Sequence, residues 1–228
     1  MNVAVASNFA ATMQRIEQAF EDRSEHEIRI IRGSSGKHYA QIINGAPFDV
    51  FLSADQLRPR LLVEEGIAEN SALSTYAQGL LALWSRDGDL SLGKEYLLNS
   101  DNYDVIAIAN PRLAPYGQAA TEVFSSLGLE VMANDRLVMG ENIAQAFQFA
   151  FSGNADLGMV AYSQTLSPNI HKQGSVWLVP SELYRPIKQD MIVLKESMAA
   201  SEFAAFMKSD TVREILLSSG YVPPEGEQ

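Results

Sequence analysis

The sequence predicts an α/β fold made of two lobes, each with a central sheet flanked by helices. Short apolar runs typical of strands alternate with longer segments in which apolar residues recur at helical spacing. Consecutive strand–helix units of this kind imply a parallel sheet with helices on its faces. The alternation begins again near Tyr76, so the series occurs twice along the chain. Two lobes with a cleft between them are the simplest arrangement of such a sequence.

The first sixty residues contain three predicted strands, each followed by a hydroxyl-bearing residue and a predicted helix. The strands and the residues that follow them are 3–6 with Ser7, 27–32 with Ser34 and Ser35, and 48–52 with Ser53. Gln56 lies three residues after Ser53, which predicts a capping box at the start of the third helix. Because the carboxyl ends of parallel strands share one edge of a sheet, this edge is the expected functional edge.

The remainder of the chain continues the pattern with further strands, helices and one polar loop. Strands are expected at 76–85, 104–111, 156–163, 175–180 and 186–196, helices at 114–128 and 140–154 and twice within 200–220, and a polar loop at 86–103. Gly128 and the Ser-Gly-Asn turn at 152–154 end the two central helices.

Composition excludes several classes of function. The chain has 228 residues, a formal net charge of −11 and no cysteine. Clustered Lys and Arg, the signature of nucleic-acid binding, are therefore not expected. Disulfides, thiolate nucleophiles and cysteine metal sites are excluded. The apolar runs are too short to span a bilayer. We expect a secretory signal to have been removed, with Met1 standing in its place.

Catalytic and metal-binding motifs are absent from the sequence. Gly-Ser-Ser-Gly-Lys at 33–37 is too short for a P-loop, and neither a dinucleotide-binding glycine motif nor a nucleophile elbow is present. His26, His38 and His171 lack metal-ligand spacing. The sequence therefore predicts a binding protein, with no enzymatic activity, no cofactor and no protein-bound metal ion.

The polar residues at the strand ends admit two interpretations. A helix N-terminus carries unpaired N–H groups and a partial positive charge, so it can bind an anion. Serine or asparagine at such a junction is, however, most often a simple helix cap. Convergence of several junctions in one cleft would favour the anion site, and sequence alone does not reveal convergence.

Four segments together resemble the ModA family, the molybdate-binding proteins of bacterial ABC uptake systems. They are VAVASNFAATMQRIEQAFE at 3–21, GSSGKHYAQIINGAPFDVFLSADQ at 33–56, NPRLAPYGQAATEVFSSLGL at 110–129 and GENIAQAFQFAFSGNADLGMVAYSQ at 140–164. The resemblance runs from Val3 to about Tyr221. It implies the two-lobed type II periplasmic binding protein fold, with residues 1–79 and 191–228 in the first lobe and 80–190 in the second. The hinge crossings are expected near 78–82 and 186–192.

The same resemblance implies a set of ligand-binding residues for molybdate, and also for tungstate, in the cleft between the lobes. Ser7 with Asn8, Ser35, Tyr116 and Ile143 match the family's binding positions. Ile143 is expected to act through its main-chain N–H, and the metal is held only through the oxyanion oxygens. Some relatives place a binding tyrosine where this chain has Ala161, so we expect Tyr116 to replace it and Tyr162 to be structural.

The resemblance also implies partners and location. A monomeric receptor in the periplasm, or anchored by lipid at the cell surface, would deliver the anion to a transmembrane ABC permease, with no role for nucleic acid. Two alternatives remain open. One is the same fold binding another tetrahedral anion, such as sulfate or phosphate, and the other is a cytoplasmic anion-sensing effector domain.

Overall fold

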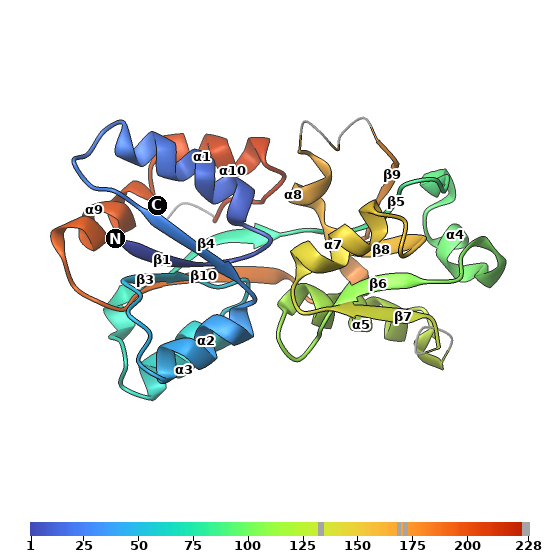
Figure 1. Cartoon of the computed structure of the whole chain (residues 1–228), viewed down its shortest axis with the longest axis horizontal. Coiled ribbons are helices and arrows are strands. Elements are labelled where there is room, and N and C mark those ends of the chain that lie inside the picture. Colours follow the sequence, from blue (N-terminus) through green and yellow to red (C-terminus); the bar gives the residue numbers. More distant parts are fainter. Residues whose placement is uncertain (132–134, 168–169, 171–172, 225–228) are drawn as a thin grey trace. The chain divides into compact units, whose positions relative to one another are not determined.

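The computed structural model describes residues 1–131, 135–167, 170 and 173–224. The chain forms two compact units, Met1–Gly79 together with Lys188–Gln228, and Leu80–Ile187. Each unit is a five-stranded sheet flanked by helices (Figure 1). No helix in the described part of the chain is long and apolar enough to cross a membrane. The predicted α/β architecture of two sheets with flanking helices is confirmed.

The first unit has a mixed sheet with strand order β2-β1-β3-β10-β4. Its strands are β1 Asn2–Ala6, β2 Arg29–Gly33, β3 Val50–Leu52, β4 Leu73–Gly79 and β10 Ile187–Val193, and its helices are α1 Ala10–Glu21, α2 Ser35–Ile43, α3 Leu57–Glu64, α9 Met198–Phe206, α10 Asp210–Ser218 and the short η1 Asn70–Ala72. Strands β1, β2 and β3 are parallel, whereas β10 runs antiparallel to β3.

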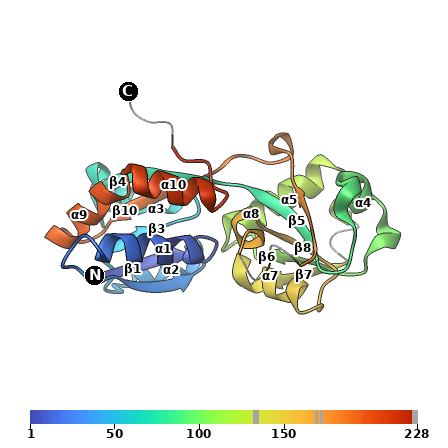
Figure 2. The ribbon, with the colours of Figure 1, turned by 90° about the horizontal axis from the view of Figure 1, so that it is seen from above.

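Helices cover both faces of this sheet because successive strand side chains point to opposite faces. Val3 and Val5 of β1 pack with apolar residues of α1, α9 and α10, whereas Ala4 packs with residues of α2 and α3. Helices α1 and α10 lie side by side over the first face (Figure 2). The all-apolar β1 is thus buried from both sides, which explains why its sequence does not alternate.

The second unit has strand order β7-β6-β8-β5-β9. Its strands are β5 Leu81–Ser85, β6 Ile106–Ala109, β7 Leu137–Gly140, β8 Leu157–Ala161 and β9 Ser175–Leu178, and its helices are α4 Lys94–Leu98, α5 Pro115–Ser126, α7 Ile143–Phe151, α8 Tyr162–Thr165 and the short η2 Leu90–Leu92, η3 Ser100–Asn102 and η4 Ser181–Leu183. Helix α7 covers one face and α5 the other (Figure 1). Strands β7 and β8 both run parallel to β6.

Three secondary-structure assignments differ from the sequence prediction. The run 76–85, predicted as one strand, is divided at Leu80 into β4 and β5, which belong to different sheets. Strand β7 was not predicted, because it is short and only Gly140 in it is buried. The polar loop expected at 86–103 contains η2, α4 and η3.

Candidate functional site

Three polar junctions meet at one edge of the first sheet. The parallel strands β1, β2 and β3 end at Ala6, Gly33 and Leu52, and the register pairs Ala6 with Gly33 and Val5 with Leu52. The residues that follow these strands therefore lie at the same edge. Ser7, Asn8 and Ser35, the three candidate residues of this unit, are brought to that edge as the sequence predicted.

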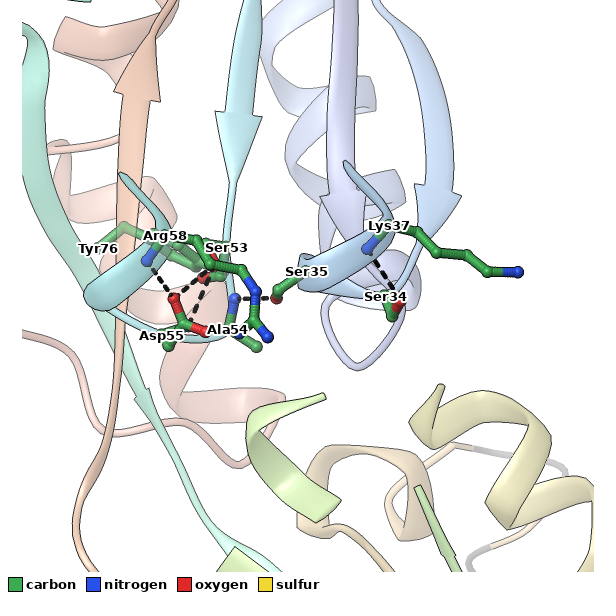
Figure 3. Close-up of polar contacts among 8 residues, drawn as sticks. All are labelled: Ser34, Ser35, Lys37, Ser53, Ala54, Asp55, Arg58 and Tyr76. Atoms are coloured by element: carbon green, nitrogen blue, oxygen red, sulfur yellow. Dashed lines mark hydrogen bonds and ion pairs between the residues drawn. The ribbon is translucent and has the colours of Figure 1, made fainter. Parts of the chain in front are cut away.

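Ser35 is the first residue of α2, and its hydroxyl is not the helix cap. The cap is Ser34, whose Oγ accepts the Lys37 N–H at 3.3 Å. The Ser35 Oγ instead accepts the main-chain N–H of Ala54 at 2.9 Å, and the residue is only 1 % exposed (Figure 3). Because this bond occupies a lone pair, the hydroxyl hydrogen remains able to donate to an acceptor outside the protein.

Ser7 likewise does not cap the helix that follows it. Helix α1 has Phe9 at its N-cap position, with no side-chain capping bond. The Ser7 N–H donates to the Gly33 carbonyl at 2.8 Å, which ties the loop after β1 to the end of β2. Within the described residues the Ser7 hydroxyl has no hydrogen-bond partner, so it too is available as a donor.

The Asn8 side chain is committed to the interior of its own unit. The residue is 4 % exposed, and its Nδ2 lies 3.0 Å from Gln189 Oε1 and 3.1 Å from the Tyr221 hydroxyl. The Tyr221 hydroxyl donates to the Asn8 carbonyl at 2.8 Å. A ligand role for Asn8 therefore rests on its main chain, while its amide fixes the loop.

The third junction differs from the prediction, because the capping box at Ser53 and Gln56 does not form. Helix α3 has Gln56 at its N-cap without a side-chain capping bond, and the Gln56 Nε2 donates to Asp190 Oδ1 at 3.0 Å. Asp55 accepts the Arg58 N–H at 2.9 Å and forms an ion pair with the Arg58 guanidinium (Figure 3). The buried Asp190 carboxylate is a stronger acceptor for Gln56 than the Ser53 main chain, so this loop is anchored to β10 instead.

His38 is a buried residue of α2 that contacts the end of β1 at the same edge of the sheet. It is 2 % exposed, and its Nε2 lies 3.2 Å from the Val5 carbonyl, which only accepts hydrogen bonds. A Cβ at Gly33 would lie 2.8 Å from the His38 ring, which explains the glycine at the end of β2. Burial lowers the pKa of the imidazole below its ordinary value of 6.5, against the opposing effects of hydrogen bonds with Gln41 and Val5. Neutral His38 thus holds β1 and α2 together.

The Lys37 side chain extends away from the Ser35 hydroxyl (Figure 3). Lys37 is an exposed residue of α2. Arg58 lies at the same edge with its guanidinium paired with Asp55, and the other donors beside Ser35 are neutral hydroxyl and amide groups (Figure 3). Such donors can bind an anion without a paired cation in contact with it.

In the second unit, the parallel strands β6 and β7 end at Ala109 and Gly140, ahead of α5 and α7. Asn142 caps α7, with its Oδ1 accepting the N–H groups of Ala144 at 3.0 Å and Gln145 at 3.1 Å. Ile143 is the first residue of this helix and is 2 % exposed. In the described part of the chain its N–H has no acceptor, as is usual for the first turn of a helix.

Tyr116 lies in the first turn of α5, which begins at Pro115. Its side chain is only 1 % exposed. Gly117 permits close packing of this turn, because a Cβ there would lie 2.1 Å from the Ala109 carbonyl oxygen at the end of β6. The Pro-Tyr-Gly sequence therefore fixes the start of α5 against its strand, and it places Tyr116 and Ile143 after neighbouring strands of one sheet.

Tyr162 is a partly buried residue of the second unit. Its N–H donates to the Leu80 carbonyl at 2.9 Å, and its side chain packs against the cluster that contains Trp84 and Phe147. These contacts are consistent with the structural role expected for Tyr162, which stays a prediction. Among the described residues, no group of three or more His, Asp or Glu side chains could hold a metal ion. His171 lies outside the described residues.

Sequence reasoning missed the residues that support the binding loops, namely Ala54, Gln189, Asp190 and Tyr221. One signal was present, because Gln189-Asp190 directly precedes the apolar run Met191-Ile192-Val193 within one predicted strand. Two adjacent polar residues in a buried strand require hydrogen-bond partners. The identity of those partners depends on contacts between residues that are far apart in the sequence.

Comparisons with known proteins agree on one family. The family model described as bacterial extracellular solute-binding protein matches residues 1–222. The molybdate-binding protein ModA of Rhodobacter capsulatus is 44 % identical over 96 % of this chain and 86 % of its own length. ModA of Azotobacter vinelandii is 41 % identical over 97 % of this chain and 89 % of its own. The solved structure of the Azotobacter vinelandii periplasmic molybdate-binding protein matches with a TM-score of 0.91 and 38 % identity, covering 99 % of this chain and all of that one.

Proposed function

Because the chain belongs to the ModA family of bacterial extracellular solute-binding proteins, we propose that it is a receptor that binds molybdate and delivers it to an ABC permease. The observation that carries this proposal is the orientation of Ser35, a buried hydroxyl at a helix start whose oxygen is engaged by Ala54 and whose hydrogen is left to donate. Such a donor suits a fully deprotonated oxyanion, whose oxygens only accept hydrogen bonds.

We propose that both units supply donors to the anion. Ser7, the Asn8 main chain and Ser35 belong to the first unit, and the main-chain N–H groups at Tyr116 and Ile143 belong to the second. A helix N-terminus contributes about 0.3–1 kcal/mol to anion binding, and up to ~2 kcal/mol when partly buried. Charge-assisted hydrogen bonds contribute roughly 1.5–3 kcal/mol each. Several neutral donors are therefore sufficient to bind a dianion firmly, with no bond made or broken.

Selectivity follows from donors that are held in fixed positions. Ser35 is fixed by Ala54, and the Ser7 loop is fixed by Gly33 and by the Asn8 side chain. Sulfate has the same charge and shape as molybdate but shorter bonds, so a rigid set of donors sized for molybdate leaves some of them unpaired with sulfate. Unpaired buried donors cost about 1–3 kcal/mol each. Tungstate, which resembles molybdate in size, is expected to bind comparably.

Membership of a family of extracellular solute-binding proteins supports a location outside the cytoplasm, and we propose a periplasmic monomer that serves a molybdate permease. Sulfate or phosphate reception and cytoplasmic sensing are the alternatives. Neither has a specific supporting contact in the site.

The test is thermal unfolding with molybdate, tungstate, sulfate or phosphate at equal low concentrations, followed by calorimetric titration of any anion that raises Tm. A ligand at about 100 times its Kd adds roughly 2.7 kcal/mol of stability. We expect a clear rise in Tm with molybdate and tungstate and none with sulfate or phosphate. A rise in Tm with sulfate or phosphate alone would identify that anion, and not molybdate, as the ligand. No rise in Tm with any of the four anions would refute the proposal that the protein is an oxyanion receptor.

A further inference from the structure

Two consecutive polar side chains lie buried in the centre of the first unit. Gln189 is 0 % exposed and Asp190 is 1 % exposed, although their neighbours Ile187, Met191 and Ile192 in β10 are apolar core residues. Burying an amide or a carboxylate is unfavourable unless the group is hydrogen-bonded. The partners of these two side chains therefore indicate why a polar pair occupies this strand.

Gln189 is bonded to the loop that follows β1. Its Oε1 accepts from Asn8 Nδ2 at 3.0 Å and from the Tyr76 hydroxyl at 2.8 Å. Tyr221 holds Asn8 from another direction, because its hydroxyl donates to the Asn8 carbonyl at 2.8 Å. Side chains from β10 and from the segment after α10 thus converge on Asn8, the residue next to Ser7, and Tyr76 of β4 holds Gln189 in turn. This arrangement fixes the course of the Ser7–Asn8 main chain.

Asp190 is bonded to the loop that follows β3. Its Oδ1 accepts from Gln56 Nε2 at 3.0 Å and from Thr75 Oγ1 at 2.6 Å. Its main chain reaches the same loop, because its carbonyl accepts the Ser53 N–H at 2.9 Å. Ala54, which lies between these anchored residues, donates to Ser35 Oγ. The carboxylate is therefore linked to the Ser35 hydroxyl through the Gln56 side chain and the loop segment 54–56.

Alternation along the strand directs the two side chains to different loops. Successive residues of a strand point to opposite faces of the sheet, so one dipeptide serves both sides. Tyr76 also links the loops, since its hydroxyl lies 3.0 Å from the Ser53 carbonyl (Figure 3). The same hydroxyl lies 2.8 Å from Gln189 Oε1. All these contacts lie within one unit.

We propose that Gln189 and Asp190 are positioning residues for anion binding, with Gln189 setting the Ser7–Asn8 loop and Asp190 setting the Ser35 hydroxyl through Ala54. This inference rests on the proposed function, because positioning is useful only if these loops hold the anion. Neither residue contacts the ligand. Both act by keeping donors at fixed positions, which is how a size-selective site distinguishes similar anions.

The test compares Gln189→Met and Asp190→Leu, which remove the acceptor oxygens at similar volume, with Gln78→Met and Asp190→Asn. Gln78 lies in the adjacent β4, where its main chain pairs with Val222, so Gln78→Met is the matched control. Asp190→Asn keeps an acceptor oxygen. We expect about tenfold weaker molybdate binding for Gln189→Met and Asp190→Leu, and values within about twofold of wild type for the other two.

Amide hydrogen exchange of the ligand-free protein gives a second readout that does not depend on molybdate. Gln189→Met is expected to speed hydrogen exchange of the Ser7 and Phe9 amides several-fold. Asp190→Leu is expected to speed hydrogen exchange of the Ser53 and Ala54 amides to a similar extent. A lower Tm with unchanged affinity and unchanged exchange at these amides would overturn the inference. If wild type fails to bind molybdate, the proposed function is wrong, and the exchange rates still decide whether the two residues hold these loops.

Two milder variants guard against misfolding. Tyr221→Phe removes the hydroxyl that donates to Asn8, and Thr75→Val removes one donor to Asp190. Each deletes a single oxygen from a partner and leaves Gln189 and Asp190 in place. Faster exchange at Asn8–Phe9 in Tyr221→Phe and at Ala54 in Thr75→Val is expected. Unchanged exchange in both would contradict the inference.

Discussion

Adjacent serines at the start of α2 perform different tasks. Ser34 caps the helix by accepting the Lys37 N–H, whereas Ser35 accepts from Ala54 across the sheet edge. Helix capping and anion donation both use serine at this position, so sequence alone does not distinguish the cap from the donor. The distinction depends on the backbone: Ser34 has the extended conformation of an N-cap, with φ −82° and ψ 152°, and Ser35 is already helical.

Ser35→Ala is expected to weaken molybdate binding by roughly tenfold to a hundredfold, the effect of losing one charge-assisted hydrogen bond. Calorimetric titration measures the affinity and circular dichroism checks the fold. The control is Ser209→Ala, which removes the capping serine of α10 in the same unit. It should cost about 1 kcal/mol of stability and leave affinity unchanged. Equal affinities for wild type and Ser35→Ala would exclude Ser35 as a ligand donor.

At the scale of the element, the start of α5 is fixed by close contact with β6. Pro115 occupies the first turn, where its missing N–H costs no hydrogen bond, and Gly117 lets the helix approach the Ala109 carbonyl. A side chain at 117 would push the helix start away from the strand end. The position of the Tyr116 N–H therefore depends on a residue that has no side chain.

Gly117→Ala should lower the stability of the protein by about 1–3 kcal/mol, because the added Cβ would lie 2.1 Å from backbone oxygen that cannot move freely. Molybdate affinity should fall with it, since the helix start is displaced. Thermal unfolding and titration measure the two effects. Gly45→Ala is the comparison: its φ of +82° is strained, but no atom lies within 4 Å of the new Cβ. It should cost roughly 1–2 kcal/mol without changing affinity. Affinity loss in both variants, or in neither, would contradict this account.

The sequence was sufficient to predict most elements and the edge at which the first three junctions meet. The buried strands β1, β3, β6 and β8 were predicted because burial on both faces leaves an unbroken apolar run. The helices α5 and α7 were predicted because their apolar residues recur at helical spacing. Periodicity did not separate β4 from β5, because Gln78 and Gly79 interrupt the run 76–85 too briefly to mark the point at which the chain changes sheets. Ser7, Ser35, Tyr116 and Ile143 came from family resemblance, and their ligand roles remain predictions.

The supporting contacts were beyond sequence reasoning. Asn8 and Gln189 are separated by 181 positions in the chain, and Asn8 and Tyr221 by 213. No local pattern of spacing connects such residues. Gln56 is a second case in which a distant residue decides the contact. The local pattern predicted a capping box, but the Gln56 side-chain amide donates to Asp190, which is far away in the sequence.

For the molecule as a whole, the net charge of −11 opposes the approach of an anion. Exposed charges more than about 8 Å from the ligand are largely screened at physiological salt. Local donors therefore decide affinity, and the global charge affects mainly the association rate at low salt.

His38 should contribute to the loss of folding stability of the whole protein at acidic pH. Its pKa is lowered by burial in the folded state, so the unfolded chain takes up the proton more readily. Stability is complete above the ordinary value of 6.5 and is lost as pH falls from there toward the lowered folded pKa. His38→Gln, which can still donate to the Val5 carbonyl, should show less loss of stability than wild type between pH 7.5 and 5.

Chemical denaturation at several pH values measures this difference. The control is His26→Gln, which changes a histidine that is 28 % exposed and paired with Glu202. Wild type and His26→Gln should lose stability more steeply than His38→Gln as the pH falls below 6.5. Parallel curves for wild type and His38→Gln would show that the buried imidazole does not contribute.

The order of the strands has a consequence for how the chain is completed during synthesis. The second unit is continuous, from Leu80 to Ile187, whereas the first needs residues from both ends of the chain. In the first sheet, β10 lies between β3 and β4. When the ribosome has made the second unit, the first therefore consists of β1, β2 and β3 without the strand that joins β4 to them. The later-made half can finish folding first, and the N-terminal half must wait for the last forty residues or so to emerge.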